Sequence, residues 1–160
     1  MVNVGLEREN SAYRFVGDQL AEITSEAEIE AVESAMEYSS PYFGTRQHLK
    51  TALILLSDRE KPDCRNSIKE SISAVESLTK AITGSDKATL GAALKMLATE
   101  LYPALTKAFS SLYGYTSDTG GIRHALLDED TVTKADAKFM LVSCSAFVGY
   151  LIEKVEVETS

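Results

Sequence analysis

The chain has 160 residues, of which 44% are hydrophobic and 25% are charged, a composition typical of one soluble globular domain. Its 24 acidic and 16 basic residues give a formal net charge of -8. This balance excludes a protein whose whole surface binds nucleic acid, because phosphate binding needs a positive local field. Two cysteines, Cys64 and Cys144, are too few for a disulfide framework and favour a reducing, cytoplasmic location.

The first predicted element is a β-hairpin near the start of the chain. Two short, partly alternating runs, Tyr13–Val16 and Gln19–Ile23, flank the turn dipeptide Gly17-Asp18. The residues before them include Glu7, Arg8 and Glu9 without an apolar run, so we expect no signal peptide. A two-stranded hairpin is marginal alone, so this one must pack on helices.

Helical signals follow the hairpin. Ser25 and Glu28 form a capping box that opens a first helix, and Pro41 closes it. A second helix is expected from about Thr45 to Leu56. After Asp63 the pattern is clearest, and it ends near Gly84, where a C-cap is expected. Five apolar residues recur there at helical spacing: Ile68, Ile72, Val75, Leu78 and Ile82.

The second half of the chain is also predicted to be helical. We expect helices at about 89–98, at about 104–112 behind Pro103, and a short one at about 122–127. Thr133-Lys134-Ala135-Asp136 resembles an N-terminal cap, and the last long helix then runs to about Lys154, with 155–158 expected to fray. With short connections, these helices should form an antiparallel bundle of about 25–154, in one domain of residues 1–160.

The last helix contains the longest apolar stretch, Phe139–Ile152. This stretch is too short to span a bilayer, so we expect a buried helix and no membrane contact. It is more apolar than a solvated surface helix, which favours either the centre of the core or part of a subunit interface. Phe147, Tyr150 and Leu151 are the residues that we would test for an interface.

A polar, glycine-bearing connection, 114–125, carries the main candidate site. It contains Gly120-Gly121, which can hold a phosphate or simply allow a tight turn, and it ends in the pair Arg123-His124. A guanidinium can hold a phosphate and an imidazole can transfer a proton near neutral pH. The alternatives are that His124 anchors the loop and that Arg123 forms a structural ion pair with Glu70 or Asp118.

A second candidate lies at the start of the helix that follows Asp63. Arg65, Ser67 and Lys69 at a helix N-terminus can bind a phosphate or RNA. The alternative is a solvated first turn capped by Asp63. Glu70 lies close to the apolar stripe and needs a partner, for which we favour Arg123.

Other chemistries find no support in the sequence. His48 is expected to be a helix-surface residue. The chain has no zinc-ligand spacing, no P-loop and no Gly-x-Ser-x-Gly elbow, so we expect neither a metal nor a cofactor.

Several segments together carry a family resemblance: Arg65–Glu76, Leu112–Tyr115 with Gly121–Ala125, Asp136–Phe147, and the hairpin of 13–23. They resemble the C-terminal region of bacterial abortive-infection proteins of the AbiJ-like group, which is similar to HEPN domains. The resemblance covers about residues 10–153. It implies an all-α HEPN-like bundle, a role in anti-phage defence, a homodimer, and a further N-terminal domain or partner protein that this chain lacks.

Many HEPN domains are metal-independent ribonucleases, with a histidine four to six residues after an arginine. This chain keeps Arg123, but His124 follows at once, and Leu127, Asp128 and Glu129 occupy the expected histidine positions. We therefore expect a non-catalytic dimerisation or interaction module. The alternative is a ribonuclease or RNA-binding effector that uses Arg123 and His124.

Overall fold

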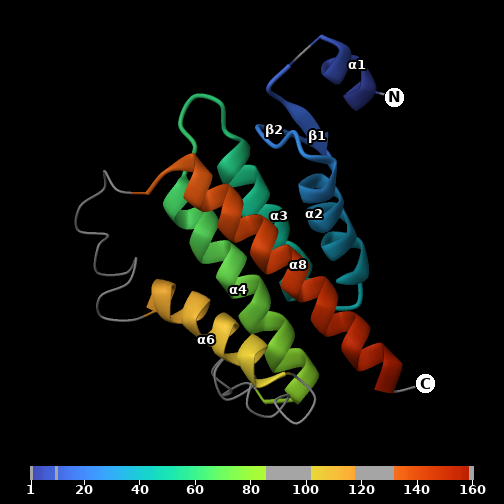
Figure 1. The fold of residues 1–160 in the computed structure, drawn as a ribbon, viewed down its shortest axis with the longest axis vertical. Coiled ribbons are helices and arrows are strands. Elements are labelled where there is room, and N and C mark those ends of the chain that lie inside the picture. The colour runs from blue at the N-terminus through green and yellow to red at the C-terminus, as the bar shows by residue number, and fades with distance from the viewer. Residues whose placement is uncertain (1, 10, 86–101, 118–131, 159–160) are drawn as a thin grey trace.

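The computed structural model describes residues 2–9, 11–85, 102–117 and 132–158. This part of the chain is mostly helical, with one small antiparallel sheet (Figure 1), which confirms the all-α class with an N-terminal hairpin. The described elements are α1 (Val2–Arg8), β1 (Arg14–Val16), β2 (Gln19–Ala21), α2 (Glu26–Tyr38), α3 (Phe43–Ser57), α4 (Cys64–Thr83), α6 (Pro103–Ser117) and α8 (Lys134–Glu158). The helices predicted at about 89–98 and 122–127 lie outside the described residues.

The β-hairpin forms where the sequence predicts it. Strand β1 pairs antiparallel with β2, with Phe15 opposite Leu20. Gly17 takes a φ of 56° in the turn, a conformation that glycine adopts without steric strain. Val16 and Ala21 are buried, and β2 lies against α3. The helices therefore supply the stability that two strands alone lack.

Three predicted helix ends are confirmed by their capping contacts. The Ser25 hydroxyl accepts a hydrogen bond from the amide of Glu28 at the start of α2. The Asp63 carboxylate accepts one from the amide of Asn66 at the start of α4, and Gly84 ends α4 with a φ of 64°. Each contact satisfies backbone groups that the helix cannot pair internally, or lets the chain turn away without strain.

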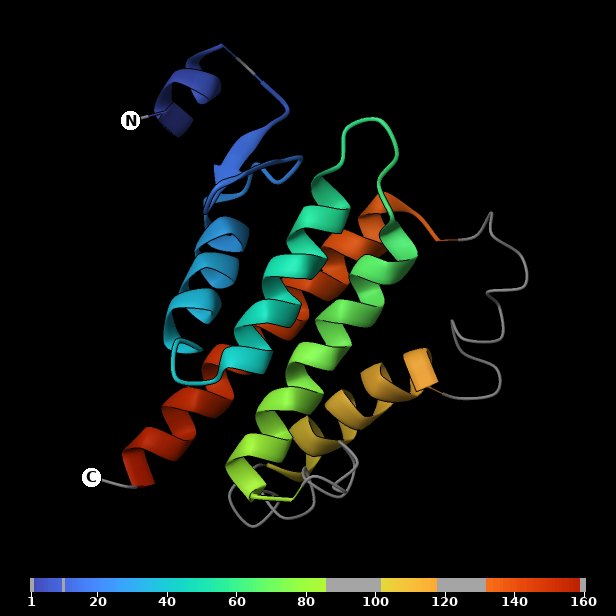
Figure 2. The same cartoon turned by 180° about the vertical axis from the view of Figure 1, so that it is seen from behind.

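Four helices enclose the core. Helix α3 packs along α4, and α8 lies against α2, α3 and α4. Figures 1 and 2 place α6 and α8 in one layer and α3 and α4 behind them, with α2 beside α8. Helices α2, α3 and α4 alternate in direction, as their short connections predict. Helix α6 then runs obliquely in the direction of α3, and α8 returns in the direction of α2 and α4, so the alternation continues through the described helices (Figure 1).

Helix α8 is the central element of this bundle. From Lys134 to Val155 it is long and apolar enough to cross a membrane by length and composition, and 50% of that stretch is buried inside the protein. Phe147 and Leu151 are 3% and 1% exposed, so the prediction of a central core helix is confirmed for them. The helix continues through Glu158, beyond the end predicted from the sequence.

Helix α1 has no counterpart in the sequence analysis. The side-chain amide of Asn3 donates to the carbonyl of Phe15 at 2.8 Å, and the Asn3 side-chain oxygen accepts from the Phe15 amide. Asn3 therefore pairs with β1 in the way that a neighbouring strand would. This contact links a short helix to the free edge of the hairpin.

Candidate functional site

The main candidate from the sequence cannot be placed in the fold. Arg123, His124, Gly120, Gly121 and Asp118 all lie outside the described residues. Their roles in catalysis, in phosphate binding and in an ion pair therefore stay predictions.

The first turn of α4 contains the second candidate, and its geometry corrects the interpretation of Ser67. Ser67 is fully buried, and its hydroxyl donates to the carbonyl of Ala52 on α3 at 2.8 Å. It ties two helices together and has no exposed atom to offer an anion. Arg65 and Lys69 are exposed. Because the Asp63 carboxylate already caps this helix end, a phosphate that bound there would meet a negative charge.

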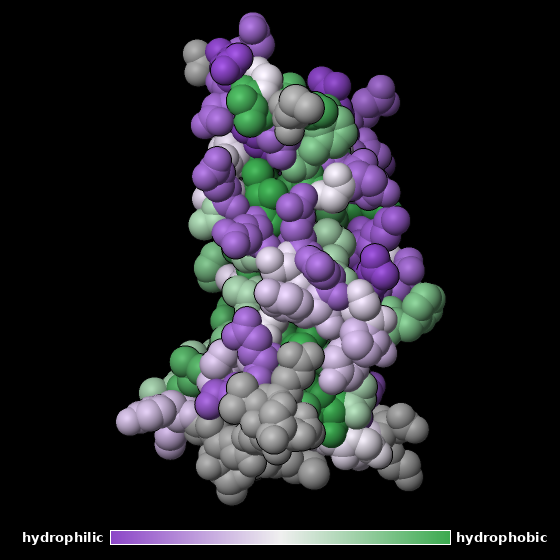
Figure 3. Space-filling view, turned by 90° about the vertical axis from the view of Figure 1, so that its right-hand side faces the viewer, coloured by the Kyte–Doolittle hydropathy of each residue, from purple (hydrophilic) through white to green (hydrophobic). Residues whose placement is uncertain are grey.

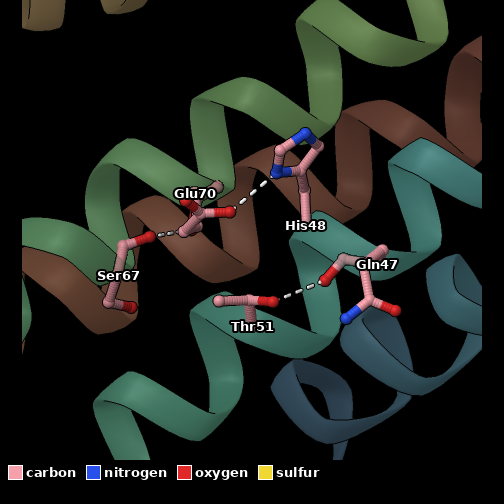
Figure 4. A network of polar contacts seen from close by, with 6 residues as sticks. Gln47, His48, Thr51, Ser67 and Glu70 are labelled. Atoms are coloured by element: carbon pink, nitrogen blue, oxygen red, sulfur yellow. Dashed lines mark hydrogen bonds and ion pairs between the residues drawn. The ribbon is translucent and has the colours of Figure 1, made fainter.

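Glu70 has a partner that the sequence did not predict. Its carboxylate lies 2.7 Å from Nδ1 of His48, which comes from the facing helix α3 (Figure 4). Both side chains are partly exposed, at 38% for His48 and 24% for Glu70. The pair ties α3 to α4 on the outside of the bundle. An ion pair between Glu70 and Arg123 stays a prediction, since Arg123 is not described.

A narrow apolar crevice lies under α6. The ring of Phe109 on α6 stacks on Phe147 of α8 at 3.4 Å between centroids. The crevice has a volume of about 20 Å³ and is lined by Ile72, Val75, Phe109, Leu112, Ser143, Cys144 and Phe147. Burial raises the pKa of the Cys144 thiol from its ordinary 9.0 to about 12. A thiol in that state is a poor nucleophile, which agrees with a packing role.

The side of the molecule that α2 forms is strongly acidic. Glu26, Glu30, Glu33 and Glu37 follow one another along one face of α2 and line a cleft of about 360 Å³ that Glu7 and Arg14 also border. These five glutamates form no ion pair within the described part of the chain. Hydrophilic side chains cover much of this side (Figure 3). It therefore repels phosphate, and RNA would have to bind elsewhere.

The outward face of α8 is apolar. Helical spacing of about 100° per residue places Ala135, Phe139, Val142, Ala146 and Tyr150 along one stripe. Phe139 is 59% exposed, Ala135 and Ala146 are exposed, and Val142 and Tyr150 are partly exposed. Helix α8 lies at the front of the molecule in Figure 1, with no described helix in front of it. An exposed helical face is normally polar, so this stripe is the best candidate for an interaction surface among the described residues.

No group of histidine, cysteine, aspartate or glutamate side chains that could hold a metal ion occurs in the described parts of the chain. Both cysteines are free. Comparisons with protein-family models, with curated proteins and with solved structures give no match.

An interface on α8 stays a prediction, but the burial of its residues can be compared with the three that the sequence suggested for a test. Of the three proposed for a test, Phe147 and Leu151 are buried and only Tyr150 reaches the surface. A helix that is apolar on every side gives no contrast from which its inner face could be identified. The helical spacing of the sequence could have identified the exposed side of α8, since Phe139 and Ala146 lie on the same side of the helix as Tyr150.

Proposed function

We propose that this chain is a HEPN-like, non-catalytic protein-interaction module of a bacterial anti-phage abortive-infection system, acting in the cytoplasm. The resemblance of its sequence to AbiJ-like proteins supports the biological setting. The observation that carries the interaction is the exposed apolar stripe of α8, from Ala135 to Tyr150.

The shape of this stripe supports a protein partner. One side of α8 contributes to the core, while Phe139 and Ala146 are exposed on its outer side. Tyr150 and Val142 lie at the edge, partly exposed and packed against the core. Aromatic residues around a flat centre are typical of protein interfaces, because they bury much apolar area at a small loss of side-chain freedom. Burial of this stripe by a partner would remove apolar surface from water.

The acidic side of α2 favours a protein partner over RNA. The glutamates that line the cleft on α2 form no ion pair among the described residues, so they create a negative field there. The whole chain carries a net charge of -8. The ribonuclease alternative depends on Arg123 and His124, and it is tested directly by the experiment below.

The test combines a phage assay with an RNA assay. Full-length protein, with its natural partners, is expressed in a bacterial host, and phage plaques are counted for wild type, Phe139→Glu and Phe43→Glu. Phe43 is a matched control, because it is 79% exposed but lies on α3. Total RNA is incubated with purified wild type and with Arg123→Ala and His124→Ala, without added metal.

We expect protection in wild type and Phe43→Glu, its loss in Phe139→Glu, and intact RNA with every protein. If wild type cleaves RNA and Arg123→Ala does not, the chain is a ribonuclease and the proposal is wrong. Equal protection by Phe139→Glu and wild type would show that the α8 stripe has no role in defence.

A further inference from the structure

We propose that the outer edge of β1 is a docking site for an extended segment of a partner protein. This segment adds to the hairpin as a further strand and carries basic residues at every second position. In the structure, the side chain of Asn3 on α1 takes the place of that strand. The inference concerns a different surface from the α8 stripe and does not depend on it.

The pairing of the hairpin leaves one edge of β1 without a neighbouring strand. Val16 pairs with Gln19 across the two-residue turn, and the next pair is Phe15 with Leu20. In antiparallel pairing, hydrogen-bonded pairs alternate with pairs whose backbone groups point away from each other. Phe15 belongs to the second kind, so its amide and its carbonyl point out of the free edge. Such an edge offers an extended peptide a donor and an acceptor side by side.

Side chains satisfy this edge in the structure. The side-chain amide of Asn3 donates to the Phe15 carbonyl at 2.8 Å, and its oxygen accepts from the Phe15 amide at 2.6 Å. Two residues further along, the carboxylate of Glu33 on α2 accepts from the amide of Gly17 at 2.7 Å. A strand from another protein can replace these contacts, because a peptide backbone offers the same kinds of donor and acceptor.

The helix that supplies Asn3 is loosely attached. None of the residues of α1 is buried, and Val2 and Val4 are 62% and 53% exposed. Among the described elements, α1 contacts β1 alone, and it lies at the end of the molecule, away from the core helices (Figures 1 and 2). A helix of 7 residues is marginal in water without tertiary packing. Its removal therefore costs little, while β1 stays in place through the buried Val16.

The surroundings of the edge determine the charge of the partner. Asn3 and Arg14 line the cleft of about 360 Å³ together with the five glutamates, so the charged groups of this cleft are mainly negative. Successive side chains of a strand point to opposite faces, so Arg14 and Phe15 lie on opposite faces of the hairpin. Every second residue of an added strand shares the face of Arg14, which borders the cleft, and should be basic. The residues between them lie beside the ring of Phe15, which is 37% exposed, and should be apolar.

Binding of a defined peptide tests the proposal. The probe is a fluorescently labelled octapeptide of alternating lysine and valine, and its anisotropy is measured with purified full chain from about 1 μM to about 1 mM. We expect saturable binding that is at least about fivefold tighter in Asn3→Ala, because the competing side chain is absent. Gln47→Ala is the matched control, since it removes an exposed amide from α3, which contacts β2 and not β1. Absence of binding to Asn3→Ala, or equal constants for Asn3→Ala and wild type, would overturn the proposal.

A pair of charge reversals locates the peptide. Glu30→Lys, in the cleft, should weaken binding at least about tenfold. Glu153→Lys makes the same change in net charge at an exposed position of α8 and should have a much smaller effect. Equal weakening by the two variants would show that the peptide responds only to the overall charge, against the proposed site.

Backbone methylation distinguishes strand addition from attraction by charge. Two further octapeptides carry N-methyl groups on the lysines only or on the valines only. In a strand, alternate amides point to opposite edges, and an N-methyl group blocks the edge to which it points. One methylated peptide should therefore bind as the parent does and the other should not bind. Equal affinities of the two methylated peptides would refute strand addition. Phe139→Glu should bind the parent peptide as wild type does, so failure here leaves the proposed role of the α8 stripe unaffected.

Discussion

The contact between Phe109 and Phe147 should control access to Cys144. Phe109 is partly buried and is the residue by which α6 stacks on α8, and both rings line the crevice that contains the Cys144 thiol. Replacing Phe109 with alanine removes the stack and leaves the rest of the α8 core unchanged. We expect α6 to separate more often from α4 and α8, and the thiol to become exposed each time.

The expected loss of stability of the closed α6 follows from the burial of the Phe109 ring. Burying about half of a phenylalanine side chain contributes about 1 kcal/mol, and an aromatic pair adds about 0.5–1.5 kcal/mol. The free energy that keeps α6 closed should therefore fall by about 1.5–2.5 kcal/mol in Phe109→Ala. At about 1.4 kcal/mol for each factor of ten, the open state becomes about 10 to 60 times more populated.

Thiol labelling with a disulfide reagent near pH 8 measures this change in a Cys64→Ser background. Cys144 has a pKa of about 12 while buried, against an ordinary 9.0, so the closed state holds about a thousandfold less thiolate and labelling reports on opening. Ser111→Ala is the control, since Ser111 is exposed on α6 and donates only within its own helix. An unchanged labelling rate in Phe109→Ala would refute the idea that this stack holds α6 in place.

Three further predictions concern the stability of the bundle. Leu53→Ala should lower the free energy of unfolding by about 2–5 kcal/mol, and Ile54→Ala by less than about 1 kcal/mol. The reason is that Leu53 is 1% exposed and Ile54 is 44% exposed. Similar losses for the two variants in urea unfolding would contradict the assigned core. His48 and Glu70 should show a coupling of about 0.5–1.5 kcal/mol in a double-mutant cycle to alanine, whereas additive losses would show that the contact contributes nothing. The hydroxyl and the amide of Thr133 donate hydrogen bonds to the Asp136 carboxylate and hold its pKa below the ordinary 3.8. This contact therefore stabilises the folded protein above about pH 4, and the stabilisation is lost as pH falls through the lower pKa of the folded state. Asp136→Asn should remove that part of the pH dependence of urea unfolding, and an unchanged acid profile would argue against the cap.

The elements that the sequence predicts well are those set by local chemistry. The Gly17 turn, the Ser25 and Asp63 caps and the Gly84 helix end each depend on residues within a few positions of one another. Local signals do not determine how distant helices meet. The apolar pattern of α8 does not show which of its sides meets α2, α3 and α4, and α1 has too weak an apolar pattern to be recognised without its contact through Asn3.

The candidate sites show the same distinction. Sequence spacing identified Glu70 as a carboxylate in need of a partner, but His48 lies 22 residues earlier and faces it only because α3 and α4 pack side by side. The position of Ser67 in the first turn of a helix predicts that it binds a phosphate, whereas the close approach of α3 turns its hydroxyl inward to the carbonyl of Ala52. In both cases the missing information was the rotation of one helix against the next.

The central place of α8 also has a consequence for how the protein is made. Helices α2, α3 and α4 leave the ribosome with their apolar faces complete, but α8, which covers those faces, follows much later in the sequence. At about 5–20 residues per second, the roughly 50 residues between the end of α4 and the start of α8 take several seconds to synthesise. During that time a half-built core is exposed, and chaperones that bind nascent apolar segments should engage this chain until α8 emerges.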